Sequence, residues 1–248
     1  MASTVIKNWD NKTWLSSNDY IESFNKFLIK KIKLNSKSKI LDIGCGRGKI
    51  LGSLSSRLRL KNKPLGIDIT NHKDKDKRIT FNQIDASTFF LKNQLKFDLI
   101  LIKQTIHLFN FREIKKLLSL SKKNLTQDGK ILILTLETHK NELPTFRLMK
   151  TRLTKSLQRD KKIFNLITTL YPYKKSKFSY KVNITKKKYI KMIQKKYISI
   201  LLPLTKEQIQ IGVREINHKY KNHIKFSDKL ICITSVSYTH LTLPTKRI

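Results

Sequence analysis

The feature that most constrains the fold is the segment at 40–50, ILDIGCGRGKI, in which an apolar run ends in an acid and three glycines follow at alternate positions. The run at 40–43 has the length and hydrophobicity of a buried strand. The apolar spacing from Lys49 to Leu60 predicts a helix directly after the glycines. Glycine adopts positive φ and leaves the main chain bare, and a helix start offers free N–H groups. The segment therefore predicts a strand, a turn and a helix whose backbone lies against a ligand such as a nucleotide.

The glycine spacing excludes two common nucleotide-binding motifs. Dinucleotide-binding turns read G-x-G-x-x-G, whereas residues 44–48 read G-x-G-x-G and Lys49 stands where the third glycine would be. A phosphate-binding P-loop requires Ser or Thr after Gly-Lys, and Ile50 stands there instead. The turn is thus expected to bind a nucleotide of another kind.

Strands and helices alternate over the first 136 residues. Besides 40–43, the hydrophobic pattern predicts strands at 65–69, 79–84, 97–102 and 130–136. Asn110 and Glu113 have the spacing of a capping box, and the helix that they begin is expected to include Leu125 and to stop at Gly129. Strands separated by helix-length segments imply a parallel sheet with right-handed crossovers. We expect an α/β fold, Rossmann-like, with helices on both faces of a mostly parallel sheet; an α+β domain of another topology is the alternative.

The pattern changes after residue 137. The segment at 138–173 reads as mainly helical, 178–184 alternates like a strand, helices are expected from Thr185 and Thr205, and 228–234 reads as a closing strand. The expected regions are an N-terminal helical cap (1–36), a nucleotide-binding core (37–137), a largely helical insertion or lid after the fifth strand (138–222), a closing strand of the core (223–235) and a tail (236–248).

Acids also end the second and third strands. Asp68 ends the second strand, where a carboxylate can accept both ribose hydroxyl hydrogens, and Asp85 ends the third, where an acid can accept from an adenine amino group. The fourth strand leads into KQTIH at 103–107. Over residues 38–136 these motifs resemble the class I S-adenosylmethionine-dependent methyltransferases. The resemblance implies S-adenosylmethionine as the cofactor and no metal.

The resemblance also implies which residues bind the cofactor. The loop after the first strand would lie against the methionine end, the acid of the second strand against the ribose and that of the third against adenine. The implied residues are Asp42, Gly44, Cys45, Gly46, Gly48, Asp68, Ile69, Asp85, Ala86 and Lys103. Two alternatives stay open, because Asp42 could only cap the loop and Asp85 could only cap the next helix. Tyr20 lies in a segment that resembles a helix covering the cofactor, although Trp14, Tyr20 and Phe24 could instead pack on the sheet.

Lys103, Gln104 and His107 follow the fourth strand and are the candidate catalytic residues. The sulfonium methyl is already activated, so the enzyme has to align a nucleophile and exclude water. Many small-molecule members of the family read N-E-x-x-H-H here, whereas Lys103 and Gln104 replace the first two residues and Leu108 replaces the last. His107 is expected to be either a general base or a packed or capping side chain.

The segment at 178–216 resembles the substrate side of small-molecule methyltransferases. Phe178, Tyr180, Tyr197 and Arg214 are the residues expected to line the acceptor pocket. Arg214 could pair with a substrate carboxylate. The alternative is that the aromatic residues form the core of the lid and that Arg214 is a surface charge.

The net charge of +36 also suits a polyanion partner. Arginine, the better phosphate ligand, is scarce among the 53 basic residues, and the abundance of Lys, Ile and Asn fits AT-rich codon usage. Motifs of base methylation are missing, since no N/D-P-P-Y/F segment follows the fourth strand and neither Cys45 nor Cys232 suits a cysteine adduct. The leading hypothesis is methyl transfer to a small molecule. An RNA methyltransferase using its lysine-rich surface and a non-catalytic S-adenosylmethionine-binding protein are the alternatives.

The two ends of the chain carry further expectations. VSYTHLTLPT at 236–245 matches the translation of a transposase-type sequencing adapter, so we interpret 236–248 as non-native and give His240 no role. The first 14 residues lack the apolar core of a signal peptide, and no window approaches the roughly 18 apolar residues of a membrane span. A cytoplasmic protein without disulfides is expected, and the oligomeric state is left open.

Overall fold

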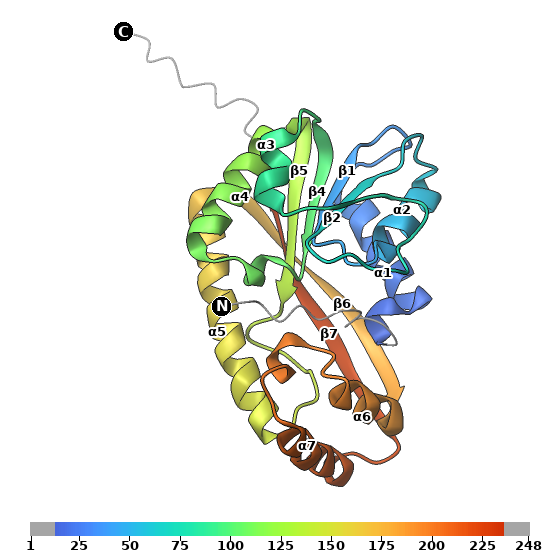
Figure 1. Cartoon of the computed structure of the whole chain (residues 1–248), viewed down its shortest axis with the longest axis vertical. Coiled ribbons are helices and arrows are strands. Elements are labelled where there is room, and N and C mark those ends of the chain that lie inside the picture. Colours follow the sequence, from blue (N-terminus) through green and yellow to red (C-terminus); the bar gives the residue numbers. More distant parts are fainter. Residues whose placement is uncertain (1–12, 236–248) are drawn as a thin grey trace.

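One seven-stranded sheet organises residues 13–235, the part of the chain that this computed structural model describes (Figure 1). The strands are β1 (Ile40–Ile43), β2 (Leu65–Asp68), β3 (Thr80–Gln83), β4 (Phe97–Lys103), β5 (Leu125–Leu136), β6 (Tyr173–Thr185) and β7 (His223–Ser235). Their order is β3-β2-β1-β4-β5-β7-β6, and β1 to β5 run parallel while β7 is antiparallel to both neighbours. The expected α/β fold with a mostly parallel sheet is confirmed.

Helices cover both faces of the sheet because β4 is apolar on both sides. The helices are η1 (Trp14–Ser16), α1 (Asn18–Lys31), α2 (Lys49–Leu58), α3 (Ala86–Lys92), η2 (Ile106–Leu108), α4 (Phe111–Lys123), α5 (Arg147–Leu170), α6 (Lys186–Gln194), η3 (Ser199–Leu201) and α7 (Lys206–Lys219). Leu99 and Leu101 of β4 belong to the same core as α1 and α2, whereas Ile100 and Ile102 belong to the core of α3 and α4. This alternation is the period of two that a strand imposes on its side chains.

The observed helix α2 ends at Leu58, two residues before the expected end, and α4 differs from its prediction more clearly. The capping box of Asn110 and Glu113 is present, but α4 ends at Lys123 and Leu125 already pairs with Phe97 as part of β5. The prediction that Leu125 lies in the helix and that Gly129 ends it was wrong. Gly129 lies instead where the β4–β5 register shifts, and a Cβ there would meet the Phe97 carbonyl oxygen at 2.5 Å. A glycine in a strand interior is typical of such an irregularity.

The segment at 138–222 is not a single insertion. The strand expected at 178–184 is part of β6, which pairs with β7 from Tyr173 opposite Ser235 to Thr185 opposite His223. The carboxyl-terminal half of α5, with Ile163 and Ile167, packs in the α3–α4 core. The helical addition therefore consists of α6, η3 and α7, which lie beyond the carboxyl ends of the parallel strands (Figure 1), together with the amino-terminal half of α5. The alternating pattern of β6 was visible in the sequence, but its pairing partner was not.

Some expectations lie outside the described residues. Residues 1–12 of the N-terminal cap and the tail at 236–248 belong to this group. Within 13–235, no helix combines the length and the hydrophobicity needed to cross a membrane.

Candidate active site

The glycine turn after β1 is held in place by hydrogen bonds of its own backbone. The N–H groups of Gly44 and Cys45 donate to the Ile67 carbonyl of β2, at 2.8 and 3.1 Å, and Gly48 N–H donates to the Cys45 carbonyl at 3.0 Å. Because the turn uses these groups internally, the ligand can meet a fixed main chain rather than a flexible one. Asp42 does not cap the turn through these groups, so that alternative is not supported.

Each of the three glycines has positive φ, but they differ in what surrounds them. Their φ angles are 73°, 55° and 70°. A Cβ on Gly44 would lie 2.3 Å from Thr105 Oγ1, and one on Gly48 would lie 2.1 Å from the Ile79 side chain. At Gly46 nothing lies within 4 Å of an added Cβ. Space next to bare backbone is therefore open at Gly46 alone, as a ligand lying against the turn requires.

Asp68 is fixed beside this open space. Its Oδ2 accepts the Gly46 N–H at 2.9 Å and its Oδ1 accepts the Thr70 N–H at 2.8 Å. Each carboxylate oxygen keeps acceptor capacity for a further hydrogen bond. The next residue, Ile69, is 56% exposed, which is unusual for a large apolar side chain. A rigid acceptor next to an uncovered apolar surface fits a ribose and its base, so the residues present fit the cofactor.

Asp85 caps a helix, as one of the two open alternatives anticipated. Its Oδ1 accepts the Thr88 N–H of α3 at 2.9 Å, and hydrogen bonding from Thr88 holds the pKa of the carboxyl below its usual value. Ala86, the first residue of α3, is buried. A carboxylate can accept further hydrogen bonds while it caps a helix, so the adenine role of Asp85 stays a prediction.

A buried carboxylate and a lysine face each other where β1 and β4 end. Burial raises the pKa of Asp42 to about 7, while the Lys103 ammonium opposes this and Asp68 adds to it. Lys103 Nζ donates to Gln104 Oε1 at 3.0 Å and lies 5.3 and 5.4 Å from the ring centres of Tyr20 and Phe24. Such distances allow cation–π attraction. The two predicted site residues Asp42 and Lys103 are thus brought together.

The N-terminal aromatic residues pack on the antiparallel end of the sheet. Tyr20 is fully buried and makes edge-on ring contacts with Phe178 and Tyr180 of β6, at 5.6 and 5.1 Å between ring centres. The Trp14 indole N–H donates to Asp228 Oδ2 of β7 at 2.9 Å. This is the packing alternative stated for Trp14 and Tyr20. The Tyr20 hydroxyl nevertheless has no hydrogen-bond partner among the described residues.

The segment after β4 holds the remaining candidate catalytic residues. Gln104 has a φ of 53°, a left-handed conformation that is uncommon outside glycine. Burial and the nearby Arg159 lower the pKa of His107 to about 4. Arg159 also donates to the backbone carbonyls of His107 and Phe109, at 2.7 and 3.0 Å. His107 is therefore neutral at pH 7 and a weaker base than an ordinary histidine.

The four residues expected to line the acceptor pocket lie in different surroundings. Phe178 and Tyr197 are each 3% exposed and belong to the hydrophobic core, where the Tyr197 hydroxyl meets that of Tyr189 at 3.0 Å. Tyr180 is half-buried against Tyr20, whereas Arg214 lies exposed on α7. This arrangement matches the alternative of a packed core and a surface charge.

Asp228 was not among the predicted site residues. It is 5% exposed at the start of DKLICIT, a run that otherwise reads as an ordinary strand. The only signal in the sequence was an acid heading an apolar strand, and buried acids are rare unless paired. Its hydrogen-bond partner Trp14 lies 214 positions away in the sequence, and no local sequence pattern reveals such a contact.

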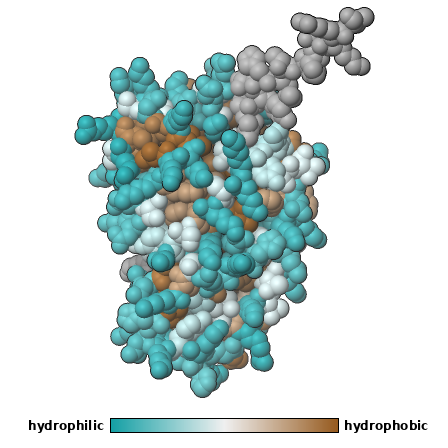
Figure 2. Space-filling view, turned by 180° about the vertical axis from the view of Figure 1, so that it is seen from behind, coloured by the Kyte–Doolittle hydropathy of each residue, from teal (hydrophilic) through white to brown (hydrophobic). Residues whose placement is uncertain are grey.

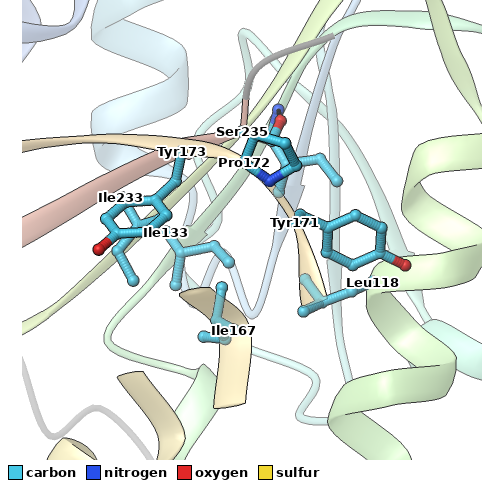
Figure 3. Close-up of a pocket in the computed structure, with 9 residues that line it drawn as sticks. Leu118, Ile133, Ile167, Tyr171, Pro172, Tyr173, Ile233 and Ser235 are labelled. Atoms are coloured by element: carbon cyan, nitrogen blue, oxygen red, sulfur yellow. Dashed lines mark hydrogen bonds between the residues drawn. The ribbon is translucent and has the colours of Figure 1, made fainter. Parts of the chain in front are cut away.

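An apolar hollow lies away from the glycine turn, where α4, α5 and the sheet meet (Figure 3). Its lining residues are Leu118, Ile131, Ile133, Ile167, Tyr171, Pro172, Tyr173, Ile233 and Ser235. None of them is an acid, a histidine, a cysteine or an amine, and the two tyrosine hydroxyls point outward in Figure 3. The Ser235 hydroxyl accepts the Ile131 N–H at 2.9 Å, so the hollow offers no acid–base group and its serine already has a partner.

Comparison with protein families identifies the core of the chain. The model of the methyltransferase domain family matches residues 34–197. The protein 235L of Invertebrate iridescent virus 6, which is named as a methyltransferase, is 25% identical over 100 residues. That match spans 39% of this chain and 37% of the viral protein, so the chain aligns with little more than a third of this relative's length.

Solved structures of similar fold cover nearly the whole chain. The S-adenosylmethionine-dependent methyltransferase of Thiobacillus denitrificans, in complex with S-adenosyl-L-homocysteine, is 12% identical with a TM-score of 0.55 and covers 93% of this chain and 97% of its own. The plantazolicin methyltransferase BpumL, in complex with a pentazolic desmethylplantazolicin analogue and S-adenosyl-L-homocysteine, is 18% identical with a TM-score of 0.52. That match covers 92% of this chain and 88% of BpumL. The chain therefore belongs to the methyltransferase domain family and has the fold of the class I S-adenosylmethionine-dependent enzymes, as the resemblance implied.

Proposed function

We propose that this protein transfers the methyl group of S-adenosylmethionine to a small-molecule acceptor. The observation that carries the proposal is the open space at Gly46, bordered by a rigid turn and by the fixed carboxylate of Asp68. When bound, the cofactor supplies an activated methyl group on its sulfonium. The turn at 44–48 would hold the methionine end and Asp68 the ribose, while Ile69 and Asp85 would meet the base.

The candidate catalytic residues are placed to orient the acceptor rather than to remove a proton from it. With a pKa of about 4, His107 accepts a proton only weakly at neutral pH. Lys103 and Gln104, joined by a hydrogen bond of 3.0 Å, stand at the carboxyl end of β4 and can orient an acceptor. The arrangement suits a nucleophile that is already unprotonated near pH 7 or that ionises readily.

A small acceptor is favoured by the architecture around the carboxyl edge. The helices α6 and α7 lie beyond this edge (Figure 1), and ligands of open α/β sheets bind outside the carboxyl ends of the strands. BpumL, whose fold is similar, is a plantazolicin methyltransferase that has been crystallised with a desmethylplantazolicin analogue. These two observations support small-molecule methylation here, with Phe178, Tyr180, Tyr197 and Arg214 still only predicted contacts. The expected cytoplasmic location also stays a prediction.

RNA methylation is the second candidate function, and the charge of the surface favours it. The net charge is +36, and hydrophilic side chains cover most of the face shown in Figure 2. Exposed lysines follow the edge strand β6 at Lys174, Lys175, Lys177 and Lys181. Lysines on an edge strand also prevent edge-to-edge aggregation, so they do not require an RNA partner.

Methyl labelling separates these functions. The purified full chain is incubated with methyl-labelled S-adenosylmethionine and cell extract, and the label is followed into metabolites, RNA and protein. We expect label in the metabolite fraction, and we expect Asp68→Ala to abolish it. Label in RNA would establish the second function instead. Binding of the cofactor without transfer in any fraction would identify a non-catalytic binding protein and contradict the proposal.

A further inference from the structure

The Lys103 ammonium interacts electrostatically with two buried carboxylates. Asp42 is the penultimate residue of β1, Lys103 ends β4 and Asp228 lies in the first half of β7. Both carboxylates are 5% exposed. Burial raises the pKa of each, and in each case the Lys103 ammonium opposes the effect of burial. Lys103 therefore lies within electrostatic reach of both acids.

The charges of this cluster do not balance. Two carboxylates share one ammonium, and Asp68 adds a further negative charge that acts on Asp42. Asp68 itself is stabilised by the amide groups of Gly46 and Thr70. Charges interact more strongly in a poorly solvated site than in water. When the acids are ionised, the cluster carries an excess of negative charge that a cationic ligand can neutralise.

A second observation points to a ligand at this place. The Tyr20 hydroxyl is completely buried, has no hydrogen-bond partner among the described residues and lies near Asp228, whose charge acts on it. Buried polar groups without partners are rare in proteins, and each one calls for an explanation such as a catalytic role or a bound group. The Trp14 indole holds the Asp228 carboxylate from the other side at 2.9 Å. The Trp14 indole thus fixes the orientation of the Asp228 carboxylate, and the Tyr20 hydroxyl, which has no partner among the described residues, lies near it.

We propose that Asp228 makes the site prefer the positively charged methyl donor over its product, whose sulfur is uncharged. The donor carries one positive charge more than its product, because the sulfonium becomes a neutral thioether when the methyl group leaves. An excess of buried negative charge binds the sulfonium form more tightly and lets the neutral product dissociate. This inference rests on the proposed function, and it adds Asp228, with Trp14 behind it, as a specificity-determining residue.

Calorimetry at pH 8 tests the proposal through a ratio of two affinities. S-adenosylmethionine and S-adenosylhomocysteine are each titrated into wild type and into Asp228→Asn, which keeps an acceptor for Trp14 and loses the charge. We expect the ratio of the two affinities, which measures the preference for S-adenosylmethionine, to be about tenfold smaller in the variant than in wild type. In wild type the preference should also fall as the pH is lowered from 8 to 6, because the buried acids then take up protons and the excess of negative charge is lost. Asp128→Asn is the matched control, since Asp128 is exposed in β5 and its loss changes net charge equally.

The outcomes are distinguishable. The proposal is overturned if Asp228→Asn, folded by its thermal melting curve, keeps the wild-type ratio within twofold, or if Asp128→Asn shifts the ratio as much. Should Asp228→Asn fail to fold, a wild-type ratio that stays the same between pH 8 and pH 6 overturns the proposal as well. Wild type that binds neither compound contradicts the proposed function itself, and the inference with it.

Discussion

The two sides of the candidate site are built in different ways. The donor side consists of the turn at 44–48 and Asp68, where backbone hydrogen bonds set the geometry and space is open at Gly46. The opposite side consists of side chains from α1, β6 and β7, such as Tyr20 and Asp228, packed closely together. Main-chain geometry is dictated locally by glycines, whereas the packed side depends on contacts between distant segments. We therefore expect substitutions at Gly46 and Asp68 to affect binding, and substitutions of the packed aromatic side chains to affect stability.

The largest effect is expected from alanine at two of the three glycines. Gly46→Ala places a methyl group in the open space, so it should weaken S-adenosylhomocysteine binding by about 100-fold through loss of contact with the backbone, for a stability cost of about 1–2 kcal/mol from positive φ. Gly44→Ala should destabilise the protein more, because its Cβ would lie 2.3 Å from Thr105 Oγ1. Calorimetry and urea unfolding of both variants measure the contrast. If both variants lost the same affinity and had the same free energy of unfolding, Gly46 and Gly44 would not differ in role.

The lowered pKa of His107 should affect how the free energy of unfolding depends on pH. Its pKa is about 4 in the folded protein, below the ordinary value of 6.5, so the unfolded chain binds a proton between these values and the folded chain does not. Stability is therefore lost as pH falls from 6.5 towards 4. His107→Gln should reduce the loss between pH 7 and 4.5 by about 1–2 kcal/mol, less than the full linkage because the ring is partly exposed. Urea unfolding at both pH values measures it, and parallel profiles for variant and wild type would show that the histidine is not perturbed.

The smallest effect is expected at the buried hydroxyl of Tyr20. Since this group has no partner among the described residues, Tyr20→Phe should raise the free energy of unfolding of the ligand-free protein by about 1 kcal/mol. Tyr189→Phe is the control, because that hydroxyl donates to the Pro144 carbonyl and its removal should destabilise. A loss of stability in Tyr20→Phe, measured by urea unfolding, would mean that the hydroxyl is satisfied.

Local patterns in the sequence predicted much of the sheet and of the donor side. The strand at 40–43 was placed to the residue, and the capping boxes at Asn110 and Thr205 are present. Leu125 was assigned to a helix because its hydrophobicity suits either element, and only pairing with Phe97 decides between them. Asp85 shows the same limit, since capping and ligand binding use the same kind of residue.

The packed side could not be predicted because its contacts are long-range. Phe178 and Tyr197 were chosen as aromatic residues in a substrate-side segment, but their surroundings depend on how α1 and β7 pack against them. The edge position of β6 likewise follows from pairing with β7, which comes 38 residues after β6 ends (223 − 185). Side-chain character is visible in a sequence, whereas the partner that buries a side chain is not.

The most direct test of the donor site is calorimetric titration of S-adenosylhomocysteine into ligand-free wild type and into Asp68→Asn. We predict one site per chain in wild type and about 10- to 100-fold weaker binding in the variant, because a charged acceptor of the ribose hydroxyls is lost. Wild type that is folded and shows no heat of binding, or a variant that binds as tightly as wild type, would contradict the account.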